Sequence, residues 1–225
     1  MTDLASRSAE GSIDGNGWSA GVVVKHQMGD WLVSGALDGG RTAFDANRHL
    51  QFGEVNRHAS GQFDVVHYGL HSRIARQIPF QSWYLKPYLD LHATHLQSGA
   101  YTEQGADDLN LRVSGSSENV FVAAPMLEAG GRFDFGAAST LRLYGALGGA
   151  FYSQGSVGSD MQFVGGDAAQ RKFQVQADLP DERLKATAGV DLKANDHLNV
   201  RLEYGGEFAD HYSSNQESLK VSYSF

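Results

Sequence analysis

Apolar and polar residues alternate with a period of two along most of this chain. The pattern is clearest over residues 83–96, where Trp83 and Leu85 alternate with Tyr84 and Lys86. Successive side chains of a β-strand point to opposite faces, so this period predicts strands with one apolar and one polar face.

The same period predicts nine strands joined by connections that alternate between short and long. The expected strands are residues 17–27, 31–41, 62–76, 82–97, 118–135, 140–153, 183–193, 197–209 and 217–225. Long connections are expected over 42–61, over 98–117 and, longest, over 154–182, with a medium loop through His211. Short turns on one side and long loops on the other are typical of outer-membrane barrels.

Proline at position 87 interrupts the clearest strand pattern. Because proline has no backbone N–H to donate to a ladder, Pro87 predicts either a demoted strand or a local break in the pairing.

The composition excludes a membrane-spanning helix but not membrane-spanning strands. No stretch reaches the roughly 20 apolar residues that such a helix requires, and mean hydropathy is −0.34. Transmembrane strands of about 10 residues escape this criterion because they alternate lipid-facing and lumen-facing side chains. Aromatic residues near strand ends favour a barrel further, namely Trp18, Trp31, Trp83, Tyr204 and Tyr223.

The predicted fold class is therefore all-β, an antiparallel transmembrane β-barrel of the outer membrane. A soluble β fold remains the alternative, since one face of an antiparallel sheet in water alternates in the same way. The absence of cysteine excludes disulfides and thiolate chemistry. A net charge of −8 with scattered Lys and Arg argues against a nucleic-acid partner.

Charged residues on the polar faces are expected to line the lumen: Lys86, Asp90, Glu128, Arg132, Arg142, Arg201, Glu203 and Glu207. They either pair across neighbouring strands, which keeps buried charge tolerable, or position a segment in transit, and the two uses are compatible. Leu89, Leu127, Leu143, Leu202 and Val221 are expected to face lipid.

Histidines form the one constellation with metal-binding chemistry. A turn near Pro79 sets His67 opposite His92 and His71 opposite Tyr88 on the polar face. Two facing imidazoles are able to bind a metal, but no third ligand is evident, so polar filling of the lumen is the favoured interpretation. We therefore assign no metal and no cofactor.

Catalysis has one candidate, the loop tip with Asp210, His211 and Ser213. Three reactive residue types in one loop are common by chance, and hydrolase, nucleotide-binding and metalloprotease motifs are absent. No catalytic residue is assigned, and the chain is predicted not to be an enzyme.

The C-terminal residues alternate and close on an aromatic side chain. Leu219, Val221, Tyr223 and Phe225 are the apolar positions. This ending resembles the signal by which the β-barrel assembly machinery recognises outer-membrane substrates. Lys220 stands where that signal customarily has a glycine.

Four further stretches extend the resemblance over residues 17–225: Gly29-Asp30-Trp31-Leu32, Trp83-Tyr84-Leu85-Lys86-Pro87-Tyr88-Leu89, Leu143-Tyr144-Gly145-Ala146-Leu147-Gly148 and Leu202-Glu203-Tyr204-Gly205-Gly206-Glu207-Phe208. Together they resemble the translocator domain of autotransporters, the type V secretion barrels. Residues 17–225 are thus the expected barrel domain, and residues 1–16 a flexible segment or the remnant of a preceding strand.

The resemblance implies a 12-stranded barrel in the cell outer membrane, with a helix threading its pore, that anchors a passenger domain and helps to export it. The implied partners are outer-membrane lipid, the β-barrel assembly machinery and a passenger on the same polypeptide. The alternatives are a generic porin or adhesin barrel and, third, a surface enzyme.

The strand count raises a question of parity. Nine strands cannot close an antiparallel ring, so either an odd number of N-terminal strands is missing or residues 1–17 contain one. The N-terminus has no secretory signal, and we expect a mature, cropped or partial sequence that alone forms an incomplete barrel.

Overall fold

The computed structural model describes residues 2–7, 11–135, 139–166, 172–194 and 197–223. In these ranges the backbone is almost entirely β-strand, and its helical element is a 3-10 turn, η1 (Asp107–Leu109). Over the same residues, no helix is long and apolar enough to cross a bilayer. The expected antiparallel all-β chain is confirmed for the described part.

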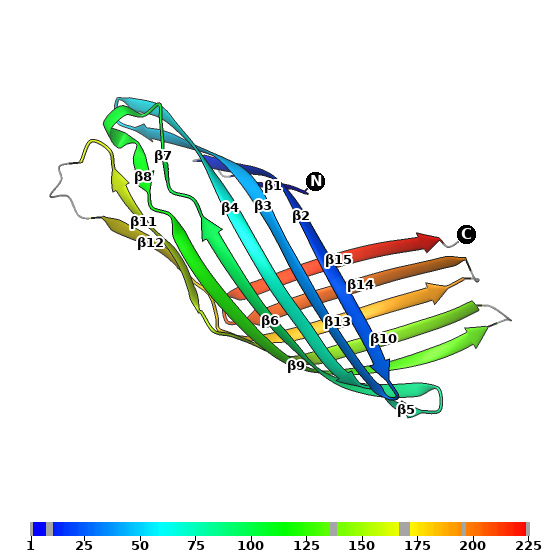
Figure 1. Cartoon of the computed structure of the whole chain (residues 1–225). Helices are drawn as coiled ribbons and strands as arrows, with labels where there is room; N and C mark the ends of the chain where they lie inside the picture. Colours follow the sequence, from blue (N-terminus) through cyan, green and yellow to red (C-terminus); the bar gives the residue numbers. More distant parts are fainter. Residues whose placement is uncertain (1, 8–10, 136–138, 167–171, 195–196, 224–225) are drawn as a thin grey trace.

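Ten strands follow one another in a single sheet that curls into an open trough (Figure 1). The order is β1-β2-β3-β4-β6-β9-β10-β13-β14-β15, with β5 paired to β6 beside this path. Their bounds are β1 (Thr2–Arg7), β2 (Gly11–Met28), β3 (Trp31–Phe52), β4 (Val55–Arg76), β5 (Ile78–Phe80), β6 (Trp83–Ser98), β9 (Ser116–Phe135), β10 (Ser139–Tyr152), β13 (Glu182–Lys193), β14 (Leu198–Ala209) and β15 (Tyr212–Tyr223).

All nine expected strands are present, and β1 is a tenth. It pairs with the first part of β2, from Thr2 opposite Gly17 to Arg7 opposite Ser12. Of the two explanations for the odd count, the structure therefore has a strand within residues 1–17. In the described residues β1 and β15 are the two edges of the sheet and do not pair with each other.

The tall hairpin of β3 and β4 corrects the expected long connection over residues 42–61. Each strand has 22 residues, and pairing runs unbroken from Trp31 opposite Arg76 to Phe52 opposite Val55. Gly53 closes the turn with a φ of +57°, a conformation that favours glycine. The expectation was wrong because beyond residue 41 the outer side chains become mostly polar and apolar ones such as Phe44, Leu50 and Phe52 lie on the inner face. The alternation thus changes phase while the backbone ladder continues.

Pro87 marks a local break without demoting β6. On one side it pairs opposite Leu127 of β9. On the other, the β4 ladder ends with Ala75 opposite Tyr88 and resumes in β5 with Ile78 opposite Leu85. The gap falls beside Pro87, where the N–H that a ladder bond requires is absent.

The other two long connections form a second sheet instead of irregular loops. β7 (Tyr101–Thr102), β8 (Leu111–Val113), β11 (Ser156–Phe163) and β12 (Phe173–Asp178) pair in the order β12-β11-β8-β7. Figure 1 shows this sheet beside the far ends of β3 and β4. A backbone bridge between Ser60 and Gln104 ties it to β4.

A buried ion pair fixes this second sheet to the tall hairpin. Glu103 is 6% exposed and accepts hydrogen bonds from Arg48 at 3.1 and 2.6 Å. The backbone N–H of Leu111 donates to the same carboxylate at 2.8 Å. The side chains thus hold a connection that the sequence pattern left without structure.

The last connection is also shorter than expected. β14 ends at Ala209 and β15 begins at Tyr212, so the medium loop through His211 is a tight turn. The final strand begins five residues before its expected start. The prediction missed these residues because Ser213 to Ser218 are polar and show no apolar alternation. The expected turns at 136–138 and 195–196 lie outside the described residues.

Candidate functional site

The polar face of the sheet lies on its concave side, and long side chains there reach across an intervening strand. Arg142 of β10 donates to the Tyr84 hydroxyl of β6 at 2.8 Å, past β9. Arg183 of β13 donates to the Tyr212 hydroxyl of β15 at 2.9 Å, past β14. Strands two positions apart are about 10 Å from each other, so such contacts need inward curvature.

Glu128 is the centre of the most buried charged cluster on this concave face. It is 4% exposed and lies 2.7 Å from Lys86 Nζ and 2.8 Å from Arg142 Nη2. The Tyr84 hydroxyl also donates to it, at 2.7 Å. The structure therefore brings three of the predicted charged residues together, and they neutralise one another through hydrogen bonds.

Asp90 and Arg201 each pair with a residue that the sequence did not single out. Arg73 of β4 donates to Asp90 at 2.7 Å, and its guanidinium lies 4.3 Å from the Tyr88 ring centroid. Arg201 donates to Asp191 at 2.6 Å. In each pair the two residues lie on neighbouring strands. The alternation placed Asp90 and Arg201 on the polar face without showing which residue each of them meets.

Glu203 and Glu207 face tyrosine hydroxyls. Tyr144 donates to Glu203, and Tyr152 donates to Glu207 at 2.7 Å, in both cases from β10 across β13. Arg183, which was not predicted, is 9% exposed and lies 3.2 Å from Glu207.

Arg132 differs from the other predicted charges because it is exposed at a strand end. Its guanidinium pairs with Asp134, two residues along the same strand, at 3.0 Å. The predicted charges are thus not one connected set, since Arg132 has no contact with the Glu128 cluster in the described interactions.

The histidines meet in a different register from the one expected. His71, not His67, lies opposite His92, while His67 lies opposite Leu96 and Tyr88 opposite Ala75. The turn is at Gln81 and Ser82 rather than near Pro79, which moves the pairing by four residues. Among the described residues, no group of three histidine, cysteine or acidic side chains has a metal-binding arrangement.

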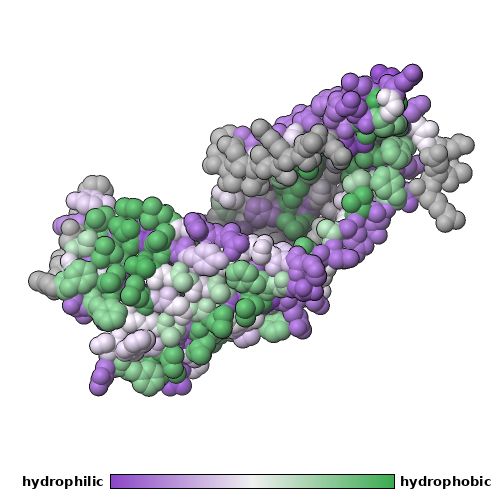
Figure 2. Space-filling view, turned by 180° about the vertical axis from the view of Figure 1, so that it is seen from behind, coloured by the Kyte–Doolittle hydropathy of each residue, from purple (hydrophilic) through white to green (hydrophobic). Residues whose placement is uncertain are grey.

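The convex face is apolar. Leu127, Leu143, Leu202 and Val221 are all exposed there, whereas Leu89 is half-buried. Figure 2 shows hydrophobic side chains covering the end of the molecule that carries β10, β13 and β14, with hydrophilic ones gathered toward the second sheet. Exposed apolar surface of this extent indicates contact with something other than water.

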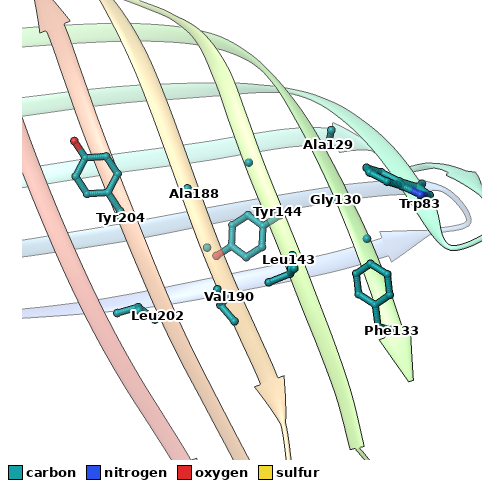
Figure 3. Close-up of a pocket in the computed structure, with 13 residues that line it drawn as sticks. Trp83, Ala129, Gly130, Phe133, Leu143, Tyr144, Ala188, Val190, Leu202 and Tyr204 are labelled. Carbon is teal, nitrogen blue, oxygen red and sulfur yellow. The ribbon is translucent and has the colours of Figure 1, made fainter. Parts of the chain in front are cut away.

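A shallow hollow of about 490 Å³ lies in this convex face (Figure 3). Trp83 and Phe133 stand at one end and Tyr204 at the other, with Ala129 and Ala188 between them. The hollow exists because the side chains of Ala129 and Ala188 are small, and its lining is continuous with the rest of the apolar face.

Aromatic side chains border the apolar face on both sides. Toward the second sheet stand Trp18, Tyr68, Phe121 and Phe151, and the next outward-facing residues beyond Trp18 and Phe121 are Asn16 and Asn119. Toward the short turns stand Trp31, Trp83, Phe133 and Tyr223. Two aromatic girdles enclosing an apolar band are typical of transmembrane barrels.

The two remaining candidate groups lie at the ends of the last hairpin. His211 and Asp210 are adjacent in its turn, 3.0 Å apart and more than 90% exposed. Leu219, Val221 and Tyr223 are exposed on β15, the edge strand, whereas Phe225 lies outside the described residues.

Comparisons with known proteins agree with this geometry. The family model for the autotransporter beta-domain matches residues 1–205. The translocator domain of the autotransporter NalP from Neisseria meningitidis is similar at 16% identity and a TM-score of 0.72, over 99% of this chain and 72% of that one. At this identity the likeness shows a shared fold.

A second solved structure, the beta domain of the Bordetella autotransporter Brka, is also 16% identical, over 99% of this chain and 96% of that one. Its TM-score of 0.32 is too low to support a structural argument. A search of curated proteins gives no match.

Proposed function

The chain belongs to the autotransporter beta-domain family, whose members are outer-membrane translocators of a passenger domain, and from this premise we propose how its two faces divide the work. The convex face lies in the lipid of the outer membrane. The concave face forms the wet wall beside which the passenger of the same polypeptide passes. The role is that of an anchor and conduit, without catalysis.

One observation carries the proposal, namely that the apolar side chains are exposed on the convex face while the charged ones meet on the concave face. In water this arrangement would leave a large apolar surface exposed to solvent. In a bilayer the apolar face contacts lipid chains, and the strands between the two edges satisfy their backbone groups among themselves. The family and this inversion together support a location in the outer membrane.

Pairing among the concave charges supports a passive wall. Glu128 binds Lys86 and Arg142, and Asp90 binds Arg73, so few charges are left to hold a passing chain strongly. A polypeptide in transit then meets a hydrated surface of ion pairs and hydroxyls, which offers weak and exchangeable contacts.

The edge strand β15 is the proposed contact with the β-barrel assembly machinery. Leu219, Val221 and Tyr223 project from it with more than half of their surface exposed, and its outer edge pairs with no described strand. An unpaired edge offers backbone groups for strand addition, and the alternate side chains offer recognition. Phe225 completes the proposed signal.

Labelling tests the division between the faces. Spin labels at Leu143 and Arg142, which are neighbours in β10, should show opposite accessibility to oxygen in lipid and to an aqueous nickel complex. Equal accessibility at the two positions would refute the assignment of faces.

Surface display tests the translocator role. The chain, produced behind an export signal and an epitope-tagged passenger, should deliver the tag to the outside of intact cells, where added protease removes it. The same passenger without the chain is the control. A barrel that reaches the outer membrane while its tag stays protected from protease would argue against translocation.

A further inference from the structure

Three histidines and one aspartate gather on the concave face where β3, β4 and β6 run side by side. His71 Nε2 lies 2.8 Å from Asp38 Oδ1, and the Nδ1 atoms of His71 and His92 share a hydrogen bond. His67 Nε2 lies 3.4 Å from Asp38 Oδ2. Side chains therefore link three strands in the order Asp38, His71, His92. The translocator role does not use this chain of contacts.

The neutral state has one consistent arrangement of protons. With Asp38 ionised, His71 must carry its proton on Nε2 in order to donate to the carboxylate. Its Nδ1 is then an acceptor, so His92 donates from its own Nδ1. Every contact in the chain is satisfied with both imidazoles neutral.

The first added proton preserves all of these contacts. Placed on His71 Nδ1, it makes that ring a donor on both sides, to Asp38 and to His92, while His92 moves its proton to Nε2 and accepts. The cation on His71 then lies against the Asp38 carboxylate, which makes that hydrogen bond charge-assisted.

The second proton breaks the link. With both rings charged, each Nδ1 carries a proton and neither has a lone pair to accept, so the hydrogen bond between His71 and His92 is lost. Two cations with ring centroids 4.8 Å apart also repel each other. Protonation of the pair is therefore coupled and proceeds in two unequal steps.

Other charges around the pair are already bound. Arg73 and Asp90, the next inward-facing pair along these strands, bind each other. The charge of Lys185 on β13 is felt at His92, and its ammonium group lies 3.6 Å from Glu207. From β9 and β2 the neighbours are Val122, opposite His92, and Val23, opposite Ala36, and neither of these two side chains titrates. In the described residues Asp38 is the carboxylate that contacts the imidazoles, with His67 as its second partner.

We propose that Asp38, His71 and His92 form an acid-sensitive clasp that holds β3, β4 and β6 together, tolerates one added proton and opens on the second. A single histidine changes its charge between about pH 5 and 8, and repulsion between the two rings means that opening the clasp requires more acid than charging one of them. Its opening changes the charge of these three side chains from −1 to +1 and loosens the concave wall at this level.

Histidine NMR tests the coupling directly. In the refolded chain in detergent micelles, the ring carbon shifts of His71 and His92 should titrate in two separated steps between pH 8 and 4.5. His26, which lies on the outward face of β2 and apart from this chain of contacts, serves as the internal reference. Independent single-step titration of both His71 and His92 would overturn the clasp.

Stability against urea provides a second measurement. Acidification from pH 7.5 to 5 should lower the unfolding midpoint of the natural chain by about 0.5 M more than that of His92→Asn, whose amide both donates and accepts without charge. His95→Asn, on the opposite face of β6, should behave like the natural chain. Parallel pH profiles for the natural chain and His92→Asn would refute the proposal without affecting the translocator role.

Discussion

The short side of the sheet and its tall side use the same strand geometry for different purposes. β13, β14 and β15 have 12 residues each, whereas β3 and β4 have 22. At about 3.3 Å per residue and a tilt of about 45°, the short strands rise roughly 28 Å and the tall ones roughly 50 Å. The hydrocarbon core is about 30 Å thick, so only the tall side extends beyond it.

The two sides also differ in how they hold charge. On the short side charges are buried on the concave face, as in the pair of Arg183 and Glu207, whose side chains are 7% and 20% exposed. On the tall side, above the apolar band, Arg41 and Asp64 pair at 2.7 Å with 58% and 41% of their side chains exposed. The comparison teaches that the membrane sets how far the outer face stays apolar, while the backbone ladder sets how far the sheet continues.

Removing one buried carboxylate from the concave face and one exposed carboxylate from the tall side should give the largest contrast. Glu128→Gln leaves Lys86 and Arg142 without their anion on the concave face and should cost about 3 kcal/mol of unfolding free energy. Asp64→Asn on the tall side should leave the unfolding free energy almost unchanged, because that pair is exposed and screened by solvent. Urea unfolding in lipid vesicles measures both, and equal costs would mean that the Glu128 cluster is as solvated as the tall side.

Arginine substitutions on the outer face should locate the edge of the lipid. Leu143→Arg places a charge in the apolar band and should cost roughly 2 to 4 kcal/mol. Ala43→Arg lies beyond the band on β3 and should change the unfolding free energy by less than about 0.5 kcal/mol. Heat-modifiable migration on gels and urea unfolding would report both, and an equally large cost for Ala43→Arg would extend the membrane contact up the tall side.

Glycines on the concave face should separate close packing from open space. A Cβ at Gly130 would meet the Tyr84 hydroxyl and ring, which Glu128 and Arg142 hold in place, whereas a Cβ at Gly205 would meet nothing within 4 Å. Gly130→Ala should therefore cost about 1 to 3 kcal/mol and Gly205→Ala almost nothing. Equal unfolding midpoints for the two variants would show that Tyr84 moves aside freely.

The smallest effect on global stability is expected from the ion pair that holds the second sheet. Glu103→Gln weakens the contact with Arg48 at the top of the tall side. This contact lies outside the apolar band between the two aromatic girdles. Amide exchange should quicken in residues 99–113 while the global midpoint stays unchanged. A fall in the global midpoint would mean that the second sheet supports the membrane-spanning strands.

Much of the fold follows from local pattern. The period of two around Trp83 and Leu143 identified strands, their two faces and the class of protein, because side-chain direction in a strand depends on backbone geometry alone. The same pattern missed β1, which is short and mostly polar, and the upper half of the β3–β4 hairpin. There the alternation changes phase, so that Phe44, Leu50 and Phe52 lie on the inner face while the outer face becomes mostly polar.

The candidate site was predictable as a face but not as a set of contacts. Lys86 and Glu128 were placed on the polar face correctly, but the partners Arg73, Asp191 and Arg183 were not identified. A side chain's face depends on its own strand, whereas its partner depends on the register and curvature that bring other strands to it.

The sequence by itself determined the strands, the two faces and the family resemblance, whereas the tertiary structure decided which residues meet. The histidines show why. Moving the pairing of β4 and β6 by four residues keeps every side chain on its own face, so the alternation is equally satisfied with His67 or His71 opposite His92. Only the turn at Gln81 and Ser82 and the ladders on both sides of β6 select His71, because they fix the register that a period of two leaves open.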